Sequence, residues 1–265
     1  MELRPEKNSA RSIDKRKKET NRIFLFLVSC ILSACCVFVS GCSVQSNSAF
    51  PDVEAAYFGN SYTIGTGSTS KHDGLYETTR SLFGDSMMTC GSGTGFAPYF
   101  GVDKFDDPEP ASFTELFEDR AEDLGEQAKS VGVVIIVSAM GDTRAFSQDP
   151  DTYKNYLEQG ISKVKELFPN AIILVYYAEG IESETNQKAF SEAYSNNQIL
   201  LDNLFSQCAD NYGYTYLGWG GKTINGDSSF FSQDGYHPND HGYEILAADL
   251  RDRIKTALEA EESTQ

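Results

Sequence analysis

Two short polar segments, far apart in the sequence, contain the residue types that nucleophilic catalysis needs. Ser61 follows Gly59 and Asn60, whereas Asp234 and His237 lie near the other end of the chain. A serine hydroxyl is a weak nucleophile until a base removes its proton, and an imidazole can remove that proton and later return it to a leaving group. An aspartate bound to the other ring nitrogen would fix the tautomer and stabilise the imidazolium. A second interpretation stays open, in which Asp234 only caps the last helix and His237 lies on the surface.

The elements that would position these segments alternate along the chain. Two continuous apolar runs, Val131–Val137 and Ala171–Tyr177, have the pattern of strands that are buried on both faces of a sheet. Shorter strands are expected at Val53–Phe58, Ser86–Cys90 and Tyr214–Leu217. Apolar residues recur at the helical period in Tyr153–Phe168 and Tyr243–Leu258, and weaker helical patterns cover Leu75–Phe83, Phe113–Lys129 and Glu184–Ala209.

Five strands separated by helices predict a parallel sheet between two helical layers. In such sheets, ligands bind where the loops leave the carboxyl ends of the strands. Four polar loops would meet at that edge, and they cover residues 59–63, 90–95, 138–142 and 234–239. Ser61 and His237 are therefore expected on the same edge of the sheet.

Residues 59–61 (Gly-Asn-Ser) and 234–238 (Asp-Gly-Tyr-His-Pro) resemble the first and last blocks of the SGNH, or GDSL-like, hydrolases. The likeness spans essentially the whole domain, and its carboxyl-terminal motif is the more specific half. The resemblance implies an α/β fold, a flavodoxin-like three-layer α/β/α sandwich with a five-stranded parallel sheet. It also implies a catalytic triad of Ser61, Asp234 and His237, and it implies neither a metal ion nor an organic cofactor.

The same resemblance implies an oxyanion hole. The N–H of Ser61 would form it together with a glycine N–H of the second block, because glycines let the backbone approach a substrate oxygen closely. Gly91 aligns best by its distance from the strand, and Gly93 stays open as the alternative.

The third block departs from the family pattern. The family usually has an asparagine followed by an aspartate there, whereas this chain has Gly141 and Asp142. The amide donor is therefore missing, and the N–H of Gly141, a water molecule or Asn60 would have to replace it. Arg144 follows closely enough to pair with Asp142 or with a substrate carboxylate, and the structural pairing is the expected one.

Residues 1–42 resemble a bacterial export signal. Basic residues, ending in Arg22, precede the uncharged run Ile23–Val39. The run leads into Ser40-Gly41-Cys42, which resembles a lipobox and implies cleavage before Cys42 and attachment of diacylglycerol to its thiol. An uncleaved signal anchor stays open, because residues 23–42 approach the roughly 20 apolar residues that span a bilayer. Both interpretations place the rest of the chain outside the bacterial cytoplasm and tethered to the membrane.

Beyond this segment, residues 43–51 have the composition of a short tether, residues 52–258 are expected to form one domain, and residues 259–265 an acidic tail. Cys90 and Cys208 are the only cysteines after position 42, and either one disulfide or two separate thiols would fit. The first 22 residues hold eight of the 22 basic and four of the 39 acidic residues, so the remainder carries a net charge of −21. Nucleic acid is therefore not an expected partner.

These features predict an extracytoplasmic serine esterase. It would remove O-acyl groups, acetyl groups above all, from carbohydrate or cell-envelope substrates through an acyl-Ser61 intermediate. Two alternatives stay open. An acyltransferase of the same fold would pass the acyl group to a sugar hydroxyl, and a catalytically inactive lipoprotein would only bind glycan or protein, as the loss of the amide at Gly141 suggests.

Overall fold

The computed structural model describes residues 48–70, 74–91, 93–97, 112–182 and 192–263. The chain divides into two units, Met1–Gln45 and Ser46–Gln265, and all described residues belong to the second unit. The expected signal segment, the lipidation site Cys42 and residues 43–47 of the expected tether lie outside the described residues. Within the described ranges, no helix combines the length and the apolar character that a membrane span requires.

Five parallel strands form one sheet, in the order β2-β1-β3-β4-β5. The central strand is buried along its whole length, as its continuous apolar sequence predicts. The strands are β1 (Phe50–Gly59), β2 (Phe83–Cys90), β3 (Val133–Ser138), β4 (Ile172–Tyr177) and β5 (Thr215–Trp219). The predicted parallel sheet is thus confirmed, and all five strands end at one edge.

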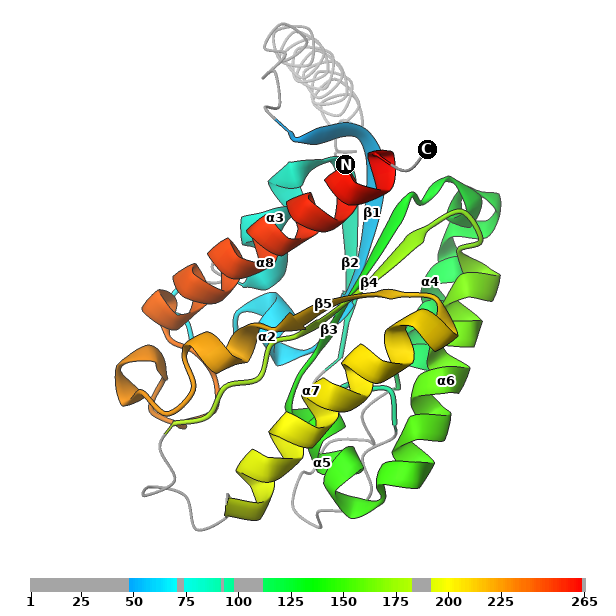
Figure 1. The fold of residues 1–265 in the computed structure, drawn as a ribbon. Helices are drawn as coiled ribbons and strands as arrows, with labels where there is room; N and C mark the ends of the chain where they lie inside the picture. The colour runs from blue at the N-terminus through cyan, green and yellow to red at the C-terminus, as the bar shows by residue number, and fades with distance from the viewer. Residues whose placement is uncertain (1–47, 71–73, 92, 98–111, 183–191, 264–265) are drawn as a thin grey trace, which may run out of the picture. The chain divides into compact units, whose positions relative to one another are not determined.

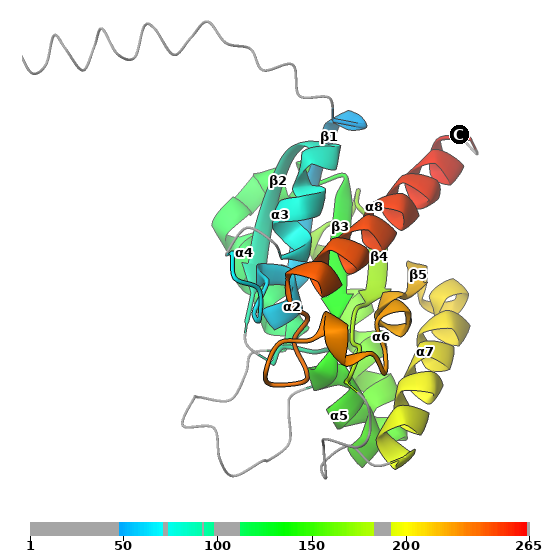
Figure 2. The same cartoon turned by 90° about the vertical axis from the view of Figure 1, so that its left-hand side faces the viewer.

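Helices cover both faces of this sheet because side chains alternate across each strand. Phe58 of β1 belongs to one buried cluster, whereas Tyr57 belongs to the other. The first face carries α4 (Phe113–Leu124), α5 (Met140–Gln148), α6 (Pro150–Leu167) and α7 (Glu192–Tyr212), and the second carries α2 (Ser61–Ile64), α3 (Leu75–Thr79) and α8 (Asp240–Glu262). Figure 1 shows the helices on either side of the sheet, and Figure 2 looks onto the face of α3 and α8.

Helix α6 combines an N-terminal cap with the apolar stripe that its sequence predicts. Asp149 caps α6 by accepting a hydrogen bond from the N–H of Thr152 at 3.0 Å, and Pro150 occupies the first turn. The residues Tyr153, Leu157, Ile161 and Val164 form its buried stripe.

Several boundaries differ from the sequence prediction. Strand β1 already begins at Phe50, inside the expected tether, because that side chain is buried and stacks on Phe83 of β2. At the other end, α8 continues to Glu262, so the expected tail is partly helical. The helix expected at Leu75–Phe83 breaks into α3 and a 3-10 turn at Arg80–Leu82 before β2 begins.

Gly125 ends α4 earlier than the sequence predicts. The segment expected as one helix, Phe113–Lys129, is α4 followed by a 3-10 turn, Gly125–Ser130. Gly125 has a φ of 55°, which an L side chain rarely adopts. The described part of the helix expected at Glu184–Ala209 begins at Glu192, and its earlier residues lie outside the described ranges.

Two short helices lie where loops were expected. The four residues of α2 follow β1, and the nine residues of α5 follow β3. Neither is long enough to display an apolar period in the sequence, which is why the pattern did not reveal them.

Cys90 on β2 and Cys208 on α7 are both free thiols, so no disulfide joins them.

Candidate active site

Ser61 is the first residue of α2, directly after the carboxyl end of β1. The turn between the strand and the helix is tight. A Cβ atom on Gly59 would lie 1.7 Å from Oγ1 of Thr63, so only glycine fits there. Thr63 in turn accepts a hydrogen bond from the N–H of Asn60 at 3.2 Å. This closed turn fixes the Ser61 side chain at the edge of the sheet.

The side chain of Asn60 is part of the framework rather than of the oxyanion hole. Its Oδ1 accepts a hydrogen bond from the N–H of Tyr62 at 3.2 Å. Its Nδ2 donates to the carbonyl oxygens of Val137 at 2.9 Å and Thr94 at 3.4 Å. Both amide hydrogens are therefore used within the protein, which rules out Asn60 among the three possible replacements for the missing amide donor. Asn60 instead connects the ends of β1 and β3 with the loop after β2.

The segment before α8 holds Asp234 by three hydrogen bonds to one carboxylate oxygen. Oδ1 accepts from the N–H groups of Tyr236 and His237 and from the hydroxyl of Ser232, each at 2.9 Å. Gly235, with a φ of 71°, allows the tight turn between these donors.

Asn239, not Asp234, caps α8. Its Oδ1 accepts a hydrogen bond from the N–H of Gly242 at 3.1 Å. The capping role that competed with catalysis for Asp234 is therefore filled by another residue.

Ser61, His237 and Asp234 form one continuous chain of hydrogen bonds. Nε2 of His237 lies 2.9 Å from Oγ of Ser61, and Nδ1 of His237 lies 2.7 Å from Oδ2 of Asp234. The side chain of His237 is 18% exposed and that of Asp234 is 42% exposed, so substrate and water can reach these hydrogen-bonded side chains. The structure thus brings together the three residues that the sequence proposed as a triad.

The Asp234 carboxyl stays ionised well below neutral pH. Desolvation acts to raise its pKa, but the hydrogen bonds from the His237 side chain, from the N–H groups of His237 and Tyr236 and from Ser232 outweigh that effect. Together they lower the pKa to about 2. An ionised Asp234 accepts the Nδ1–H of His237, which leaves Nε2 free to take the Ser61 proton.

Tyr62 packs against the imidazole of His237, a role that no sequence motif indicates. Its ring lies 5.9 Å from the His237 ring, between centroids. Its hydroxyl donates to the carbonyl oxygen of Tyr236 at 2.6 Å, and the carbonyl oxygen of Gly180 lies 3.1 Å from the same hydroxyl. Tyr62 therefore ties the serine helix to the histidine loop. Its position directly after Ser61 was the only sequence signal for this role.

The expected oxyanion donors differ in availability. The N–H of Gly91 donates to the carbonyl oxygen of Gly59 at 3.2 Å, which extends the pairing of β1 and β2 by one residue. Gly91 is therefore not free to bind a substrate oxygen, and the preference for it is wrong. For the N–H groups of Ser61, Gly93 and Gly141, the described residues supply no acceptor.

Asp142, which the sequence offered as a residue lining the site, is fully buried. Its carboxylate accepts hydrogen bonds from the N–H of Phe96 at 2.7 Å, the hydroxyl of Tyr153 at 2.9 Å and the hydroxyl of Ser138 at 2.7 Å. Arg144 is not among these partners, so the expected pairing with Asp142 is wrong. Burial raises the pKa of Asp142 to about 6, although the three hydrogen bonds oppose the shift.

A second buried carboxylate lies just after β4. Glu179 accepts the hydroxyl of Tyr177 at 2.9 Å and that of Thr143, and its carbonyl oxygen accepts Nε1–H of Trp219 at 2.7 Å. Trp219 is thus part of the core.

His241, on the first turn of α8, is exposed. Its Nδ1 lies 3.3 Å from Oε2 of Glu244 on the same helix.

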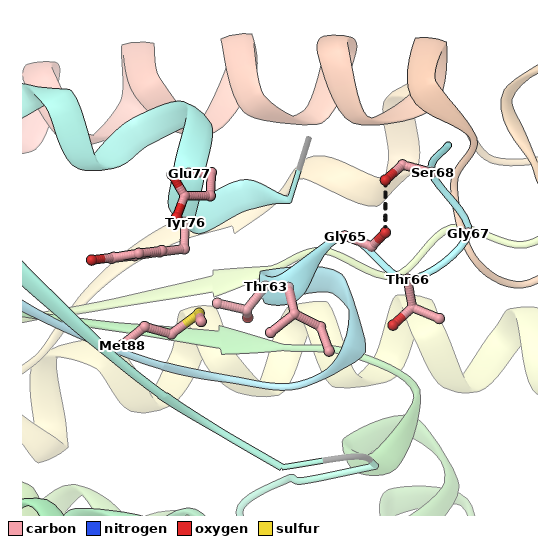
Figure 3. A pocket seen from close by; sticks show the side chains of 9 residues that line it. Thr63, Gly65, Thr66, Gly67, Ser68, Tyr76, Glu77 and Met88 are labelled. Atoms are coloured by element: carbon pink, nitrogen blue, oxygen red, sulfur yellow. Dashed lines mark hydrogen bonds between the residues drawn. The ribbon is translucent and has the colours of Figure 1, made fainter. Parts of the chain in front are cut away.

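A pocket of about 480 Å³ adjoins α2. Figure 3 shows α2 and the turn that follows it on one side, with Tyr76 of α3 and Met88 of β2 on the others. Two lining residues connect the pocket to the triad. Ile64 follows Ser61 by three positions and therefore shares its face of the helix. A Cβ atom on Gly67 would lie 2.7 Å from Cβ of His237.

No family model matches the chain, and no curated protein matches its sequence. Solved structures do match. Phospholipase A1 from Streptomyces albidoflavus NA297 is 15% identical over 77% of this chain and 99% of that chain, with a TM-score of 0.52. A carbohydrate esterase family 2 enzyme from Corynascus thermopiles (Myceliophthora fergusii) is 14% identical over 79% of this chain and 67% of that chain, with a TM-score of 0.54.

A third structure carries the family name that the motifs suggested. It is a protein from Slackia heliotrinireducens described as an SGNH hydrolase, 14% identical over 76% of this chain and 98% of that chain, with a TM-score of 0.50. Identities this low establish a shared fold. The chain therefore has the three-layer α/β/α fold of the SGNH and GDSL-like hydrolases, as its first and last sequence blocks predicted.

Proposed function

We propose that this protein is a serine esterase that acts outside the cytoplasm. It removes O-acyl groups, acetyl groups above all, from carbohydrate or cell-envelope substrates. The observation that carries the proposal is the unbroken hydrogen-bond chain from Ser61 through His237 to Asp234, with Nε2 of the histidine 2.9 Å from the serine oxygen.

In the proposed mechanism, Oγ of Ser61 attacks the ester carbonyl carbon while Nε2 of His237 takes the hydroxyl proton. Asp234 holds the Nδ1–H and stabilises the imidazolium. The tetrahedral intermediate collapses, the bond from carbon to the alcohol oxygen breaks, and Nε2–H of His237 protonates the departing alcohol. A water molecule then attacks the acyl-Ser61 ester in the same way, which releases the carboxylic acid and restores the serine.

Two observations support the choice of substrate and location. One structural neighbour is a carbohydrate esterase family 2 enzyme, and another, from Clostridium thermocellum, is a family two carbohydrate esterase in complex with cellohexaose. The lipobox-like sequence that ends at Cys42 supports an exported protein that a lipid anchors to the bacterial membrane, and an uncleaved anchor would place it on the same side.

The intact triad geometry favours catalysis over a purely binding role. A binding protein has no need of an ionised Asp234 that orients an imidazole toward a serine hydroxyl. The acyltransferase shares the acyl-Ser61 intermediate, so only the fate of the acyl group separates it from the esterase. Free acetate as the product supports the esterase, and an acylated acceptor sugar supports the transferase.

The proposed function is tested with the full chain in detergent-solubilised membranes. The substrates are p-nitrophenyl acetate and an O-acetylated oligosaccharide, and the wild type is compared with Ser61→Ala. We expect release of acetate by the wild type and a loss of more than about 10³-fold in kcat for the variant. Equal rates for the two proteins would refute the serine mechanism.

A further inference from the structure

Gly67, in the loop between α2 and α3, lies directly against the histidine of the triad. A Cβ atom on Gly67 would lie 2.7 Å from Cβ of His237 and 2.7 Å from the carbonyl oxygen of Pro238, whereas real Cβ atoms essentially never come closer than 3.0 Å to another heavy atom. Rotation of a side chain cannot relieve either contact, because one atom is a Cβ and the other belongs to the backbone. The loop therefore touches the histidine segment with no space for a side chain between them.

The same loop is also bound to the serine. The N–H of Thr66 donates to the carbonyl oxygen of Ser61 at 2.9 Å, and the hydroxyl of Ser68 donates to the carbonyl oxygen of Gly65 at 2.8 Å. Figure 3 shows the second of these bonds and the turn that it closes. Since the loop is bonded to the backbone of Ser61 and packed against His237, it connects the nucleophile with its base.

Helices on two sides hold the loop against His237. The hydroxyl of Tyr243 on α8 donates to the carbonyl oxygen of Thr66 at 2.8 Å. Gly74, directly before α3, packs against the start of the loop, because a Cβ atom there would lie 2.6 Å from the backbone nitrogen of Gly65. The loop therefore has a fixed position relative to α3 and α8.

The histidine segment is held as well. The N–H of Ser232 donates to the carbonyl oxygen of His237 at 2.8 Å. Phe231 and Pro238 form a short antiparallel bridge around this bond. Neither the loop nor the histidine segment can thus move apart without breaking hydrogen bonds, so a side chain at Gly67 would displace the imidazole.

We propose that the loop of residues 65–68 acts with Tyr62 to set the distance between Oγ of Ser61 and Nε2 of His237, and that Gly67 is the positioning residue through which the loop does so. The inference rests on the proposed function and adds a residue that acts only through the histidine. Because Gly67 has no side chain, the imidazole lies within 2.9 Å of the serine oxygen. A base takes a proton efficiently only at such a distance, so the position of the imidazole controls the rate.

The test compares Gly67→Ala with the wild type, as full chains in detergent-solubilised membranes. The new Cβ atom displaces His237 from Ser61, so we expect kcat on p-nitrophenyl acetate to fall by about 10- to 10²-fold, with KM changed by less than about threefold. The rate of labelling by a fluorophosphonate should fall by a similar factor, because this reaction also needs the activated hydroxyl. A kcat in Gly67→Ala within about threefold of the wild-type value would overturn the inference.

The control for backbone strain is Gly226→Ala. Both glycines have a positive φ, of 99° at Gly67 and 82° at Gly226, but a Cβ atom on Gly226 meets nothing within 4 Å. This substitution therefore introduces strain without a clash, and its kcat should stay within about threefold of the wild type. An equal loss of activity in the two variants would show that strain alone is responsible, and the inference would be wrong.

A double-mutant cycle shows whether Gly67 acts through His237. In His237→Ala no imidazole remains to be displaced, so adding Gly67→Ala should change the slow labelling rate of that variant by less than about twofold. A residue that only supports the fold, or the turn at Ser61, would slow labelling by the same factor with and without the imidazole. That result would overturn the inference.

Tyr243→Phe is a milder variant that keeps the packing of the ring. It removes only the hydroxyl that holds Thr66, so we expect kcat to fall by about three- to tenfold. Its matched control is Tyr214→Phe, which should keep the wild-type kcat, because that hydroxyl donates to the carbonyl oxygen of Phe205 on the other face of the sheet. If Gly67→Ala does not fold, Tyr243→Phe decides, and wild-type activity in this variant would overturn the inference.

The outcomes also separate this inference from the proposed function. If Ser61→Ala is inactive but Gly67→Ala and Tyr243→Phe have wild-type rates, the inference alone is wrong. If Ser61→Ala keeps the wild-type activity, the proposed function is wrong.

Discussion

Nε2 of His237 lies 2.9 Å from Oγ of Ser61, although 176 positions separate the two residues in the chain. The contact exists because β1 and β5 run in parallel within one sheet, so that the helix after β1 and the loops after β5 leave the same edge. Tyr62 then fixes the distance between them, since its hydroxyl binds the backbone of the histidine loop. The geometry of the site is therefore a property of the whole sheet.

Asp234→Asn should leave the loop in place but change which ring nitrogen of His237 carries the proton. An amide that donates toward Nδ1 would favour the tautomer with its proton on Nε2, which cannot accept the Ser61 proton. We expect kcat to fall by about 10³–10⁴-fold, with a small change in KM, when p-nitrophenyl acetate hydrolysis is measured near neutral pH.

The control for this substitution is Asp240→Asn. It removes the same charge at the start of α8, from a carboxylate that binds Thr69 and not His237. Exposed charges are screened, so kcat should change by less than about threefold. A similar loss in both variants would show that net charge, and not the bond to His237, matters.

The buried carboxyl of Asp142 should make stability depend on pH. Its pKa is raised from 3.8 to about 6, so the folded state binds the proton more tightly than the unfolded state. Stability from this group is therefore fully present at low pH and is lost as the pH rises from about 4 to about 6. The difference in Tm between wild type and Asp142→Asn should be more favourable to the wild type at pH 4 than at pH 7.

Asp149→Asn provides the comparison for this pH series. Hydrogen bonds from Thr152 lower the pKa of Asp149, so its contribution is present above the ordinary value of 3.8 and is lost only as the pH falls below it. The Tm difference for this variant should stay nearly constant between pH 4 and pH 7. A constant difference for Asp142→Asn as well would contradict the buried, proton-binding carboxyl.

Asn60→Ala should reduce both stability and activity. The substitution leaves the carbonyl oxygens of Val137 and Thr94 without their donor, at a cost of about 1–3 kcal/mol in the free energy of unfolding. It also loosens the turn that carries Ser61, so kcat should fall by roughly tenfold or more. Urea unfolding and ester hydrolysis measure the two effects.

Ser112→Ala is the matched variant, because Ser112 caps α4 far from the triad in sequence and accepts the N–H of Glu115. Its loss should cost about 1 kcal/mol without changing kcat. If Asn60→Ala keeps wild-type kcat despite its lower stability, the proposed link from Asn60 to the position of Ser61 is wrong.

The pocket beside α2 should admit part of the substrate. Ile64 is 43% exposed and shares a helix face with Ser61, so Ile64→Trp narrows the pocket next to the nucleophile. We expect kcat/KM to fall at least about tenfold for O-acetylated oligosaccharides and less than about threefold for p-nitrophenyl acetate. Equal effects on the large and the small ester would place the substrate elsewhere.

Sequence patterns predicted the sheet because β3 and β4 are buried on both faces and so consist of uninterrupted apolar runs. They also predicted that Ser61 and His237 would meet, since parallel strands end at one edge. Helices α2 and α5 were not predicted, because each is too short to show apolar residues at the helical period. Local pattern is thus sufficient for long elements and for the edge where they end.

The finer features of the site depend on contacts between distant backbones. The sequence alone gives no sign that the N–H of Gly91 binds Gly59, or that both amide hydrogens of Asn60 are used by Val137 and Thr94. The spacing of Gly141 from the other motifs likewise does not reveal its contact with Gly93. Gly91 and Asn60 were considered as oxyanion donors because of their positions in the motifs. In the structure, their N–H groups already donate to other parts of the backbone.

Labelling with a fluorophosphonate, followed by mapping of the modified peptide, identifies the nucleophile itself. The full chain is treated with the reagent beside Ser61→Ala and His237→Ala. We expect one modified residue, Ser61, no label in Ser61→Ala, and labelling slowed by more than about 10²-fold in His237→Ala, where no base activates the hydroxyl. Label on another serine, or equal rates with and without His237, would refute the triad.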